Sequence, residues 1–183
     1  GNVALSDTKP YKPSAGAPAQ FVAATIKENG KVIGVVALQI SLAAVNRIMT
    51  ERSGLGETGE TYLVGPDQLM RSDSFLDPKN HTVAASFADR DKGKVNTEAS
   101  KQAIAGKIGA SVILGYNGNP VLSSYAPVKI GNTTWGLLAE IDVAEAFCPK
   151  DESGEYFFKK YTQMYGYYDL FLLNPDGYAF YTV

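Results

Sequence analysis

The chain has 183 residues, of which 45% are hydrophobic and 20% charged, and its formal net charge is −2. This composition is ordinary for a globular protein and can supply a hydrophobic core, but it excludes the clustered basic surface that a nucleic-acid-binding domain carries. The sequence has one cysteine, Cys148, so no internal disulfide framework can form. The longest apolar stretch, residues 32–42, is too short and too polar to cross a bilayer.

The first part of the chain predicts a loop, a β-hairpin and a helix. Residues 1–20 are rich in Pro, Ser, Ala and Gly, which is typical of a turn-rich loop. Residues 21–26 and 32–40 predict strands joined by a turn that contains the favoured Asn-Gly pair. Because residues 32–40 are almost continuously apolar, we expect this strand to be buried on both faces. Ser41 then caps a helix that extends to Arg52.

The middle of the chain predicts a second hairpin, a helix and three further strands. Apolar β-formers at residues 61–64 end at a turn over residues 65–68, Gly-Pro-Asp-Gln, and a strand resumes at Leu69. The elements expected after it are a polar loop at 74–96 with a short helix at 82–87, a helix at 97–105 capped by Thr97, strands at 111–116, 121–127 and 134–141, and a short helix at 143–147. An antiparallel sheet of about five strands with helices on one side is the α+β pattern of PAS-like sensor modules.

This hairpin recurs near the C-terminus, after an amphipathic helix expected at 152–164. Residues 169–182 align without a gap on residues 60–73, with the Pro-Asp pair in register. Residues 18–40 likewise resemble residues 120–141. The sequence therefore predicts two copies of one module. The segments of the first copy stand in rotated order, with its back half at the start of the chain and its front half at the end.

Two explanations account for this order. One is a circular permutation, and the other is that two pieces of a longer chain are joined in the sequence. We expect the second, because residues 1–20 have the composition of mid-domain sequence and Val183 stops within a strand. The junction would then lie between Phe147 and Cys148, and residues 148–183 would precede residue 1.

Four segments carry a family resemblance: 56–67 (Gly-Glu-Thr-Gly-Glu-Thr-Tyr-Leu-Val-Gly-Pro-Asp), 69–74 (Leu-Met-Arg-Ser-Asp-Ser), 116–125 (Tyr-Asn-Gly-Asn-Pro-Val-Leu-Ser-Ser-Tyr) and 169–183 (Asp-Leu-Phe-Leu-Leu-Asn-Pro-Asp-Gly-Tyr-Ala-Phe-Tyr-Thr-Val). In the restored order the chain resembles the periplasmic sensor region of bacterial methyl-accepting chemotaxis receptors of the double Cache type. The resemblance implies a membrane-distal Cache module made of 148–183 plus 1–40, a connecting helix and linker at 41–57, and a membrane-proximal Cache module at 58–147.

The resemblance also implies a function. It is extracytoplasmic sensing of a small polar metabolite, such as a short carboxylate, coupled to transmembrane signalling, without enzymatic activity or a cofactor. The full-length receptor would be a homodimer in the inner membrane, held there by transmembrane helices outside this sequence, with a periplasmic sensor and no nucleic-acid partner. The sequence departs from the family because it lacks those helices, the cytoplasmic domain and the polar segment expected after the distal hairpin. The alternatives are the same sensor on a histidine kinase or cyclase, or a small hydrolase.

Strand alternation indicates a binding face in the proximal module. Leu69, Arg71 and Asp73 project to one side of the second hairpin strand. An arginine beside neutral hydroxyl groups can bind a small carboxylate bidentately. The alternative is that Arg71 pairs with Asp73 or Asp67 and only stabilises the sheet. The residues expected in this proximal pocket are Tyr62, Arg71, Ser72, Asp73 and Tyr125.

The equivalent face of the other copy is aromatic. The residues expected in the distal pocket are Tyr11, Ser14, Phe21, Tyr168, Phe171, Tyr178 and Phe180. We expect half of these to be core residues, because aromatic stripes are more often core than binding site. The arginine favours the proximal pocket, whereas the family resemblance favours the distal one, and the sequence leaves the choice open.

Catalysis has little support in the sequence. The single histidine, His81, lies in a polar loop, where we expect it to be solvated. Cys148 stands beside Pro149 without a clear partner for nucleophilic catalysis. No catalytic residue and no metal site are therefore expected, and a hydrolase that used Cys148 or His81 remains the alternative of a different class.

Overall fold

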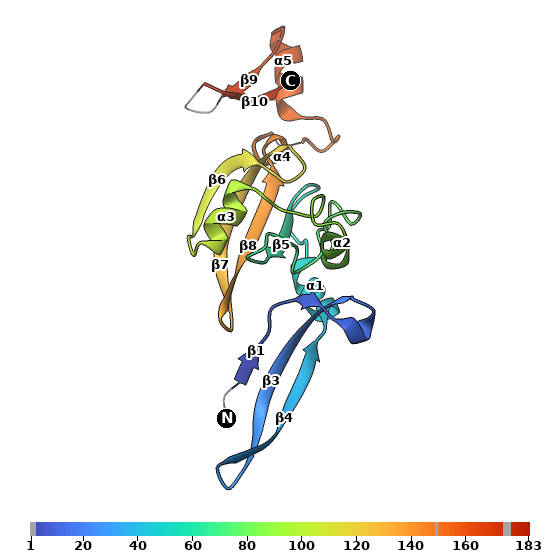
Figure 1. Ribbon diagram of the computed structural model, residues 1–183. Coiled ribbons are helices and arrows are strands. Elements are labelled where there is room, and N and C mark those ends of the chain that lie inside the picture. Colours follow the sequence, from blue (N-terminus) through green and yellow to red (C-terminus); the bar gives the residue numbers. More distant parts are fainter. Residues whose placement is uncertain (1–2, 149, 174–176) are drawn as a thin grey trace.

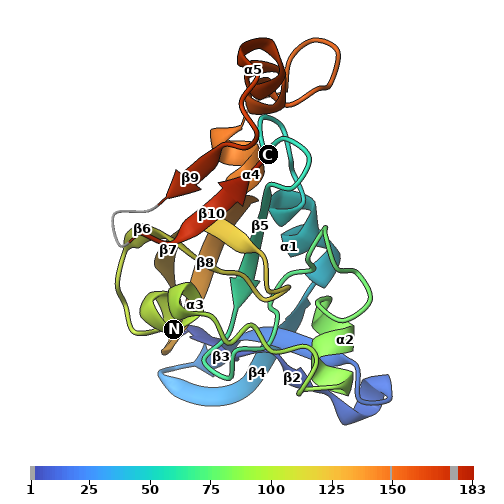
Figure 2. The ribbon, with the colours of Figure 1, turned by 90° about the horizontal axis from the view of Figure 1, so that it is seen from above.

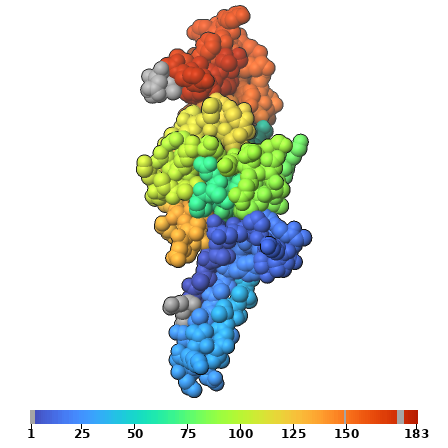
Figure 3. All heavy atoms as spheres, in the orientation of Figure 1, coloured from blue at the N-terminus to red at the C-terminus, as the bar shows by residue number. Residues whose placement is uncertain are grey.

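The computed structural model describes residues 3–148, 150–173 and 177–183. Its elements follow one another along one long axis (Figure 1). The N-terminal strands lie at one end, a central sheet with its helices lies in the middle, and a C-terminal helix and hairpin lie at the other end. The space-filling view shows the same succession, with the first and last segments of the chain separated by the middle one (Figure 3).

The N-terminal sheet is built around one long strand. Strand β3 (Pro18–Glu28) pairs along one edge with β1 (Val3–Leu5) and β2 (Lys9–Pro10), and along the other with β4 (Lys31–Ile40), all antiparallel. A 3-10 turn, η1 (Lys12–Ser14), connects β2 to β3. The β3–β4 turn uses Asn29 and Gly30 at φ values of 48° and 81°. Both residues tolerate this left-handed backbone, which is why the Asn-Gly pair predicts the hairpin correctly.

Two predictions for this region are wrong. Residues 1–20 are not entirely loop, because β1 and β2 lie within them and pair with β3. Strand β4 is not buried on its two faces: Val35 is 62% exposed and Leu38 is 64% exposed. The apolar sequence of β4 made it a good strand, but burial also needs a layer of structure over the strand, and the described residues place none there.

The central sheet has four strands in the order β5-β8-β7-β6, all antiparallel. Their bounds are Glu60–Val64 for β5, Gly109–Leu114 for β6, Pro120–Ile130 for β7 and Thr133–Asp142 for β8. Helix α1 (Leu42–Met49) leads into this sheet, α2 (Val83–Ala88) lies in the long connection, α3 (Glu98–Ile104) packs across β6, β7 and β8, and α4 (Val143–Phe147) follows β8. Thr82 and Thr97 cap α2 and α3 through their hydroxyl oxygens, as the sequence indicated for Thr97.

The hydrophobic core belongs to this central region. Its cluster of buried residues comprises Tyr62, Val64, Met70, Val83, Val95, Ala99 and Leu138. The α+β class and the antiparallel sheet of a PAS-like module are therefore confirmed. Burial of this cluster is the main stabilising contribution that we identify in the fold, since apolar burial contributes roughly 25 cal/mol per Å².

A fifth strand in this sheet is absent from the described residues, contrary to expectation. After the turn, the chain makes only isolated bridges, Val64 with Met70 and Leu69 with Lys94. The reason is local. The backbone N–H of Leu63 donates to the Ser72 hydroxyl oxygen at 2.9 Å, and the N–H of Met70 donates to Ser86. Side chains thus take the place of two backbone acceptors, whereas the N–H of Arg71 still donates to the carbonyl of Leu63.

The C-terminal segment contains α5 (Phe157–Tyr165) and the strands β9 (Phe171–Leu173) and β10 (Ala179–Thr182), which pair antiparallel. Helix α5 begins five residues later than expected, because the carboxylate of Asp151 accepts hydrogen bonds from the N–H groups of Ser153 and Glu155 and holds a turn there. The predicted hairpin turn at residues 174–176 lies outside the described residues. No helix in the described part of the chain has the length and apolar character needed to cross a membrane.

Candidate ligand-binding sites

Arg71, the predicted carboxylate anchor, is buried and already holds a carboxylate of the same chain. Its Nε donates to Oδ1 of Asp7 at 2.9 Å and its Nη2 donates to Oδ2 at 2.8 Å. This is the two-point geometry that guanidinium groups make with carboxylates. The indole Nε1 of Trp135 donates to the same Oδ1 at 2.9 Å. The structure therefore places a bidentate carboxylate on Arg71, and that carboxylate comes from the N-terminal sheet.

The remaining donors of Arg71 are also engaged. Nη2 lies 2.9 Å from Oδ1 of Asp67, and Nη1 donates to the backbone oxygen of Leu69 at 3.0 Å. Pairing with Asp67 was one of the alternatives predicted for Arg71 from the sequence, and this ion pair is present in the structure. The pairing with Asp73 is not formed. Asp7, the main partner, was missed, because no local pattern connects residues 64 positions apart.

The other predicted proximal residues have structural partners within the chain. Ser72 is fully buried and holds the N–H of Leu63. Asp73 accepts hydrogen bonds from the N–H of Val83 at the start of α2 and from Asn46 of α1. Tyr125 packs against the core cluster. These three side chains therefore join elements of the central region to one another.

Tyr62 belongs to a buried polar network that sequence reasoning missed. Its hydroxyl donates to Oε2 of Glu140 at 2.8 Å, and Ser123 donates to Oε1 of the same carboxylate at 2.8 Å. Burial raises the pKa of Glu140 and outweighs the lowering effect of these two hydrogen bonds, with the charge of Glu60 adding to the rise. Burial, with Glu140 beside it, raises the pKa of the Tyr62 hydroxyl well above its ordinary value.

Glu60 is the second buried carboxylate and lies directly opposite Glu140 in the β5–β8 register. It accepts hydrogen bonds from Ser74 and from the backbone N–H of Phe75, and the hydroxyl of Tyr116 donates to its other oxygen. The available sequence signal was an acidic residue in each of two apolar strands, at the start of β5 and near the end of β8. Recognising it would have required the strand register, which only the fold supplies.

The prediction for His81 is wrong. Its ring is 5% exposed rather than solvated, and it packs on Tyr116 with ring centroids 4.1 Å apart. Nδ1 lies 2.8 Å from Oδ2 of Asp77, and Nε2 has no hydrogen-bond partner among the described residues. The Asp77 carboxylate thus orients the ring, but no nucleophile completes a catalytic arrangement at Nε2 in the described part of the chain.

The predicted distal residues do not come together in one pocket. Tyr11 and Phe21 stack edge to face at 4.9 Å in the N-terminal sheet, with Ser14 in the adjacent 3-10 turn. The other four, Tyr168, Phe171, Tyr178 and Phe180, lie in the C-terminal segment at the opposite end of the molecule (Figure 1). The central sheet stands between the two groups, so the pocket expected from all seven residues is not assembled in this structure.

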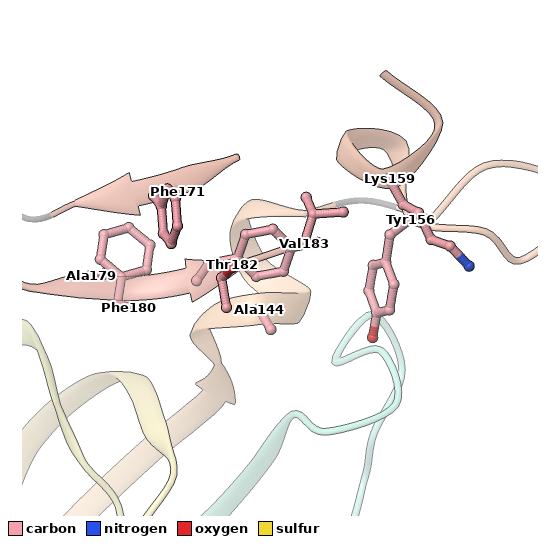
Figure 4. Close-up of a pocket in the computed structure, with 9 residues that line it drawn as sticks. Ala144, Tyr156, Lys159, Phe171, Ala179, Phe180, Thr182 and Val183 are labelled. Atoms are coloured by element: carbon pink, nitrogen blue, oxygen red, sulfur yellow. The ribbon is translucent and has the colours of Figure 1, made fainter. Parts of the chain in front are cut away.

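Two residues of the C-terminal group, Phe171 and Phe180, line a cavity, whereas Tyr168 and Tyr178 are not part of its lining. Seen along the long axis, the β9–β10 hairpin projects beyond α4 over the side of the central sheet that holds β6 and β7 (Figure 2). Between α4, α5 and this hairpin lies an open cavity of about 590 Å³. Figure 4 shows Phe171 and Phe180 at one end of the cavity and Tyr156 with Lys159 at the other. Its lining residues are Ala144, Tyr156, Lys159, Phe171, Ala179, Phe180, Tyr181, Thr182 and Val183.

This cavity has the size of a small-molecule site and a mixed chemistry. Its walls are mainly apolar, and the Lys159 ammonium and Thr182 hydroxyl are polar groups on its lining. Lys159 pairs with Glu155 at 3.3 Å in an exposed setting, and Thr182 donates to Asp169 at 2.9 Å. Because the Lys159 pair is exposed, its ammonium group can exchange Glu155 for the carboxylate of a ligand, whereas the Thr182 hydroxyl contacts both carboxylate oxygens of Asp169.

Cys148 lies buried beside this cavity. Burial raises the pKa of its thiol, and a hydrogen bond with Tyr181 counteracts the rise only in part. Burial and the nearby thiol raise the pKa of Tyr181 to about 12. A thiol with a raised pKa is a poor nucleophile. No cluster of three His, Cys, Asp or Glu side chains within the described ranges could hold a metal ion.

Comparisons with known proteins connect this fold to sensory domains. No protein-family model and no curated protein sequence matches the chain. Among solved structures, the periplasmic sensory domain of the Campylobacter jejuni chemoreceptor Tlp1 matches with a TM-score of 0.61 and 16% identity, over 82% of this chain and 53% of its own. The extracellular domain mmHK1S-Z3, assigned to a histidine kinase, matches with a TM-score of 0.56 and 18% identity, over 79% and 51%.

The ligand-binding domain of the Pseudomonas aeruginosa PAO1 amino-acid chemoreceptor PctB, in complex with L-Arg, matches with a TM-score of 0.51 and 21% identity, over 80% of this chain and 56% of its own. The chain therefore spans about half the length of each of these domains. At these identities the likeness concerns the fold. That fold is the one found in extracytoplasmic sensor domains of chemoreceptors and of a histidine kinase, as the sequence resemblance predicted.

Proposed function

We propose that this chain is part of the extracytoplasmic sensor region of a membrane receptor, and that it binds a small polar metabolite rather than catalysing a reaction. The observation that carries this proposal is the shared fold with the Tlp1 sensory domain, at a TM-score of 0.61 over 82% of the chain. A chemotaxis receptor is the first candidate for the parent protein. A histidine kinase is the second, because the mmHK1S-Z3 domain has the same fold.

The chemical class that we propose for the ligand is a small carboxylate or amino acid. The domain of PctB was solved with L-Arg, an amino acid that carries a carboxylate. In this chain, the cavity at the β9–β10 hairpin combines two aromatic rings with the ammonium of Lys159. Rings can cover an aliphatic part of a ligand, and an ammonium group can pair with its carboxylate. The proximal residues, in contrast, are saturated by partners within the chain.

We propose further that residues 148–183 and 1–40 belong to one membrane-distal module, joined by residues 41–57 to a proximal module at 58–147. Two features support this division. The first is that the sequence of the β3–β4 hairpin resembles that of the β7–β8 hairpin. The second is that β8 pairs with β5 along its other edge, whereas β4 has no second strand partner among the described residues. By the repeat, residues 169–173 are the counterpart of β5. In the receptor we place the whole region in the periplasm of a homodimer, anchored by helices outside this sequence.

Ligand binding can be tested directly on the purified chain. We expect calorimetry or thermal-shift screening with amino acids and short organic acids to find a ligand that raises Tm in a concentration-dependent way. Phe180→Ala should weaken its binding about tenfold or more, since it removes a buried aromatic contact. Phe157→Ala is the matched control, because Phe157 is an exposed phenylalanine of α5 outside the cavity lining.

The outcomes separate the parts of the proposal. If no amino acid or organic acid shifts Tm, the sensor function fails. If a ligand binds but Phe180→Ala and Phe157→Ala bind it equally well, the function stands and the cavity is the wrong site. Turnover of the ligand during the assay, followed by product analysis, would overturn the claim that the chain is not an enzyme.

A further inference from the structure

The strongest polar contact between the N-terminal sheet and the central sheet is the one that Asp7 makes. Asp7 lies between β1 and β2, whereas Arg71 follows the central hairpin and Trp135 lies on β8. Among the salt bridges of the described residues, Asp7–Arg71 is the one that joins these two sheets. The contact is therefore a joint between parts of the chain that are far apart in sequence.

The Arg71 side of this joint has the features of a built anion site. The Arg71 side chain is 1% exposed, and it presents two parallel N–H groups to the carboxylate at 2.9 and 2.8 Å. Trp135 adds a third N–H from another strand. The backbone N–H of Thr8 supplies a fourth donor, from the same segment as Asp7. Three of the four donors thus come from side chains of the central region, and one comes from the segment of Asp7 itself.

The surroundings of the guanidinium show that the fold makes room for it. A Cβ atom added to Gly65 would lie 2.1 Å from Cζ of Arg71, so the absence of a side chain there permits the observed position. The ring of Phe87 faces the guanidinium at 5.3 Å, and the same residue lines a cavity of about 420 Å³ next to the η1 turn. Phe87 thus contacts the guanidinium and also lines a neighbouring cavity.

We propose that Arg71 and Trp135 form a carboxylate-binding site on the central sheet, that the side chain of Asp7 is its resident ligand and fixes the N-terminal sheet there, and that the vacated site takes a free small monocarboxylate. Asp67 contacts the same Nη2 at 2.9 Å, but it is 35% exposed and leaves Nε and the indole N–H for the ligand. Asp7 itself is held as an anion. Burial acts to raise its pKa, and the hydrogen bonds from Arg71 and Trp135 outweigh that effect and lower it.

The test is chemical rescue of Asp7→Ala by acetate. Removing one partner of a buried charge pair leaves the other uncompensated, so we expect Tm to fall by roughly 6–20 °C. Acetate should restore most of this loss in a saturable way, whereas chloride at the same ionic strength should not. Trp135 is the single tryptophan of the chain, so its indole N–H resonance should shift in Asp7→Ala and return toward its original position as acetate binds.

The matched control is Asp89→Ala. Asp89 also pairs with a cation, Lys92, but both side chains are exposed, at 49% and 73%. This variant and the unmodified chain should show no saturable response to acetate. An equal response in all three proteins would reduce the effect to a general action of the salt and overturn the proposal. An unmoved indole resonance in Asp7→Ala would overturn it as well.

Asp7→Ala could fail to fold in chloride buffer, and the readout is then refolding. Recovery of native near-ultraviolet circular dichroism in acetate, but not in chloride, supports the site, and no recovery in acetate contradicts it. Asp7→Asn gives an independent measurement, because the amide keeps the shape of the side chain and an acceptor for Trp135. We expect this variant to fold with a smaller loss of Tm and to show no acetate rescue, since the amide still fills the site.

Discussion

The central sheet and the N-terminal sheet each contain a long antiparallel hairpin, β7–β8 and β3–β4, and the two hairpins resemble each other in sequence. In the central sheet, β8 lies between β5 and β7 and is covered by α3, so that Trp135 is 3% exposed and Leu138 is fully buried. In the N-terminal sheet, β4 pairs with β3 alone among the described residues, and Leu38 is 64% exposed. Strands β8 and β4 thus have similarly apolar sequences, but these side chains of β8 are buried and those of β4 are exposed. The difference shows that burial depends on the layer that covers a strand as much as on the strand itself.

In the central sheet, β5 pairs along the second edge of β8, and α3 packs across the sheet. By the sequence repeat, the counterpart of β5 is residues 169–173, which lie at the far end of the molecule, where apolar side chains are also exposed: Phe171 is 57% exposed and Leu173 is 58% exposed. Apolar side chains are therefore exposed both on β4 and on β9 of the same chain. This observation makes the comparison between the sheets experimentally accessible.

The largest effect is expected from restoring the order of the segments. A chain in which residues 148–183 precede residue 1 through a flexible linker should place residues 169–173 beside β4. Covering several apolar side chains contributes roughly 5 kcal/mol or more, which corresponds to a rise in Tm of roughly 10–20 °C. Amide exchange at β4 should slow in parallel. Unchanged exchange at β4 would contradict the assignment of the two segments to one module.

A leucine in each copy gives the next effect. Leu138→Ala removes a fully buried side chain and should lower the free energy of unfolding by about 2–5 kcal/mol. Leu38→Ala removes a side chain that is 64% exposed and should change it by about 0.5 kcal/mol or less. Urea unfolding measures both values. In the rearranged chain the cost of Leu38→Ala should increase, and a constant small cost would show that β4 stays uncovered.

A glycine in each copy tests close packing. Alanine at Gly65 would place its Cβ 2.1 Å from Cζ of Arg71, so we expect a loss of about 1–3 kcal/mol. Alanine at Gly34 of β4 would meet Ile26 at 3.7 Å, an ordinary contact. This control should be neutral or slightly stabilising, because the unfolded chain loses freedom. Equal losses for the two variants would mean that Arg71 adjusts at little cost.

The smallest effect concerns pH. The pKa of Glu140 is raised, mainly by burial, so between its ordinary value of 4.5 and its higher folded value the folded state binds more protons than the unfolded state. Stability should therefore fall as pH increases through that window and then level off. Glu140→Gln copies the residue at the repeat position, Gln39. This variant should lack the fall, and identical slopes for the two proteins in urea titrations would contradict the assignment to Glu140.

Much of the fold was readable from local sequence. The Asn29-Gly30 turn, the cap at Thr97 and the runs of β-forming residues in β7 and β8 act over a few residues, and the structure reproduces the elements that they predict. Local patterns could not predict whether β4 is covered, because the sequence of a strand does not specify which elements pack against it.

The site was harder to predict for a related reason. The alternation around Leu69 indicated Arg71 as a ligand anchor, which stays a prediction, and the pairing with Asp67 lay within reach of a four-residue spacing. Its main partner, Asp7, is 64 residues away, and the opposed carboxylates Glu60 and Glu140 meet only through strand register. The hydrogen-bond partner of a buried polar group is often distant in the sequence, so the partner can be identified from the fold but not from residue spacing.

The open edge of β4 has a practical consequence for the behaviour of the chain in solution. The strand is ten residues long and contains no proline, and along its outer edge the described residues leave the backbone N–H and C=O groups without a strand partner. Such an edge is a template on which another polypeptide can add as a strand. Self-association should therefore increase with protein concentration and with removal of Lys31, the single charge within β4, so biophysical measurements belong at low concentration with light scattering as a check.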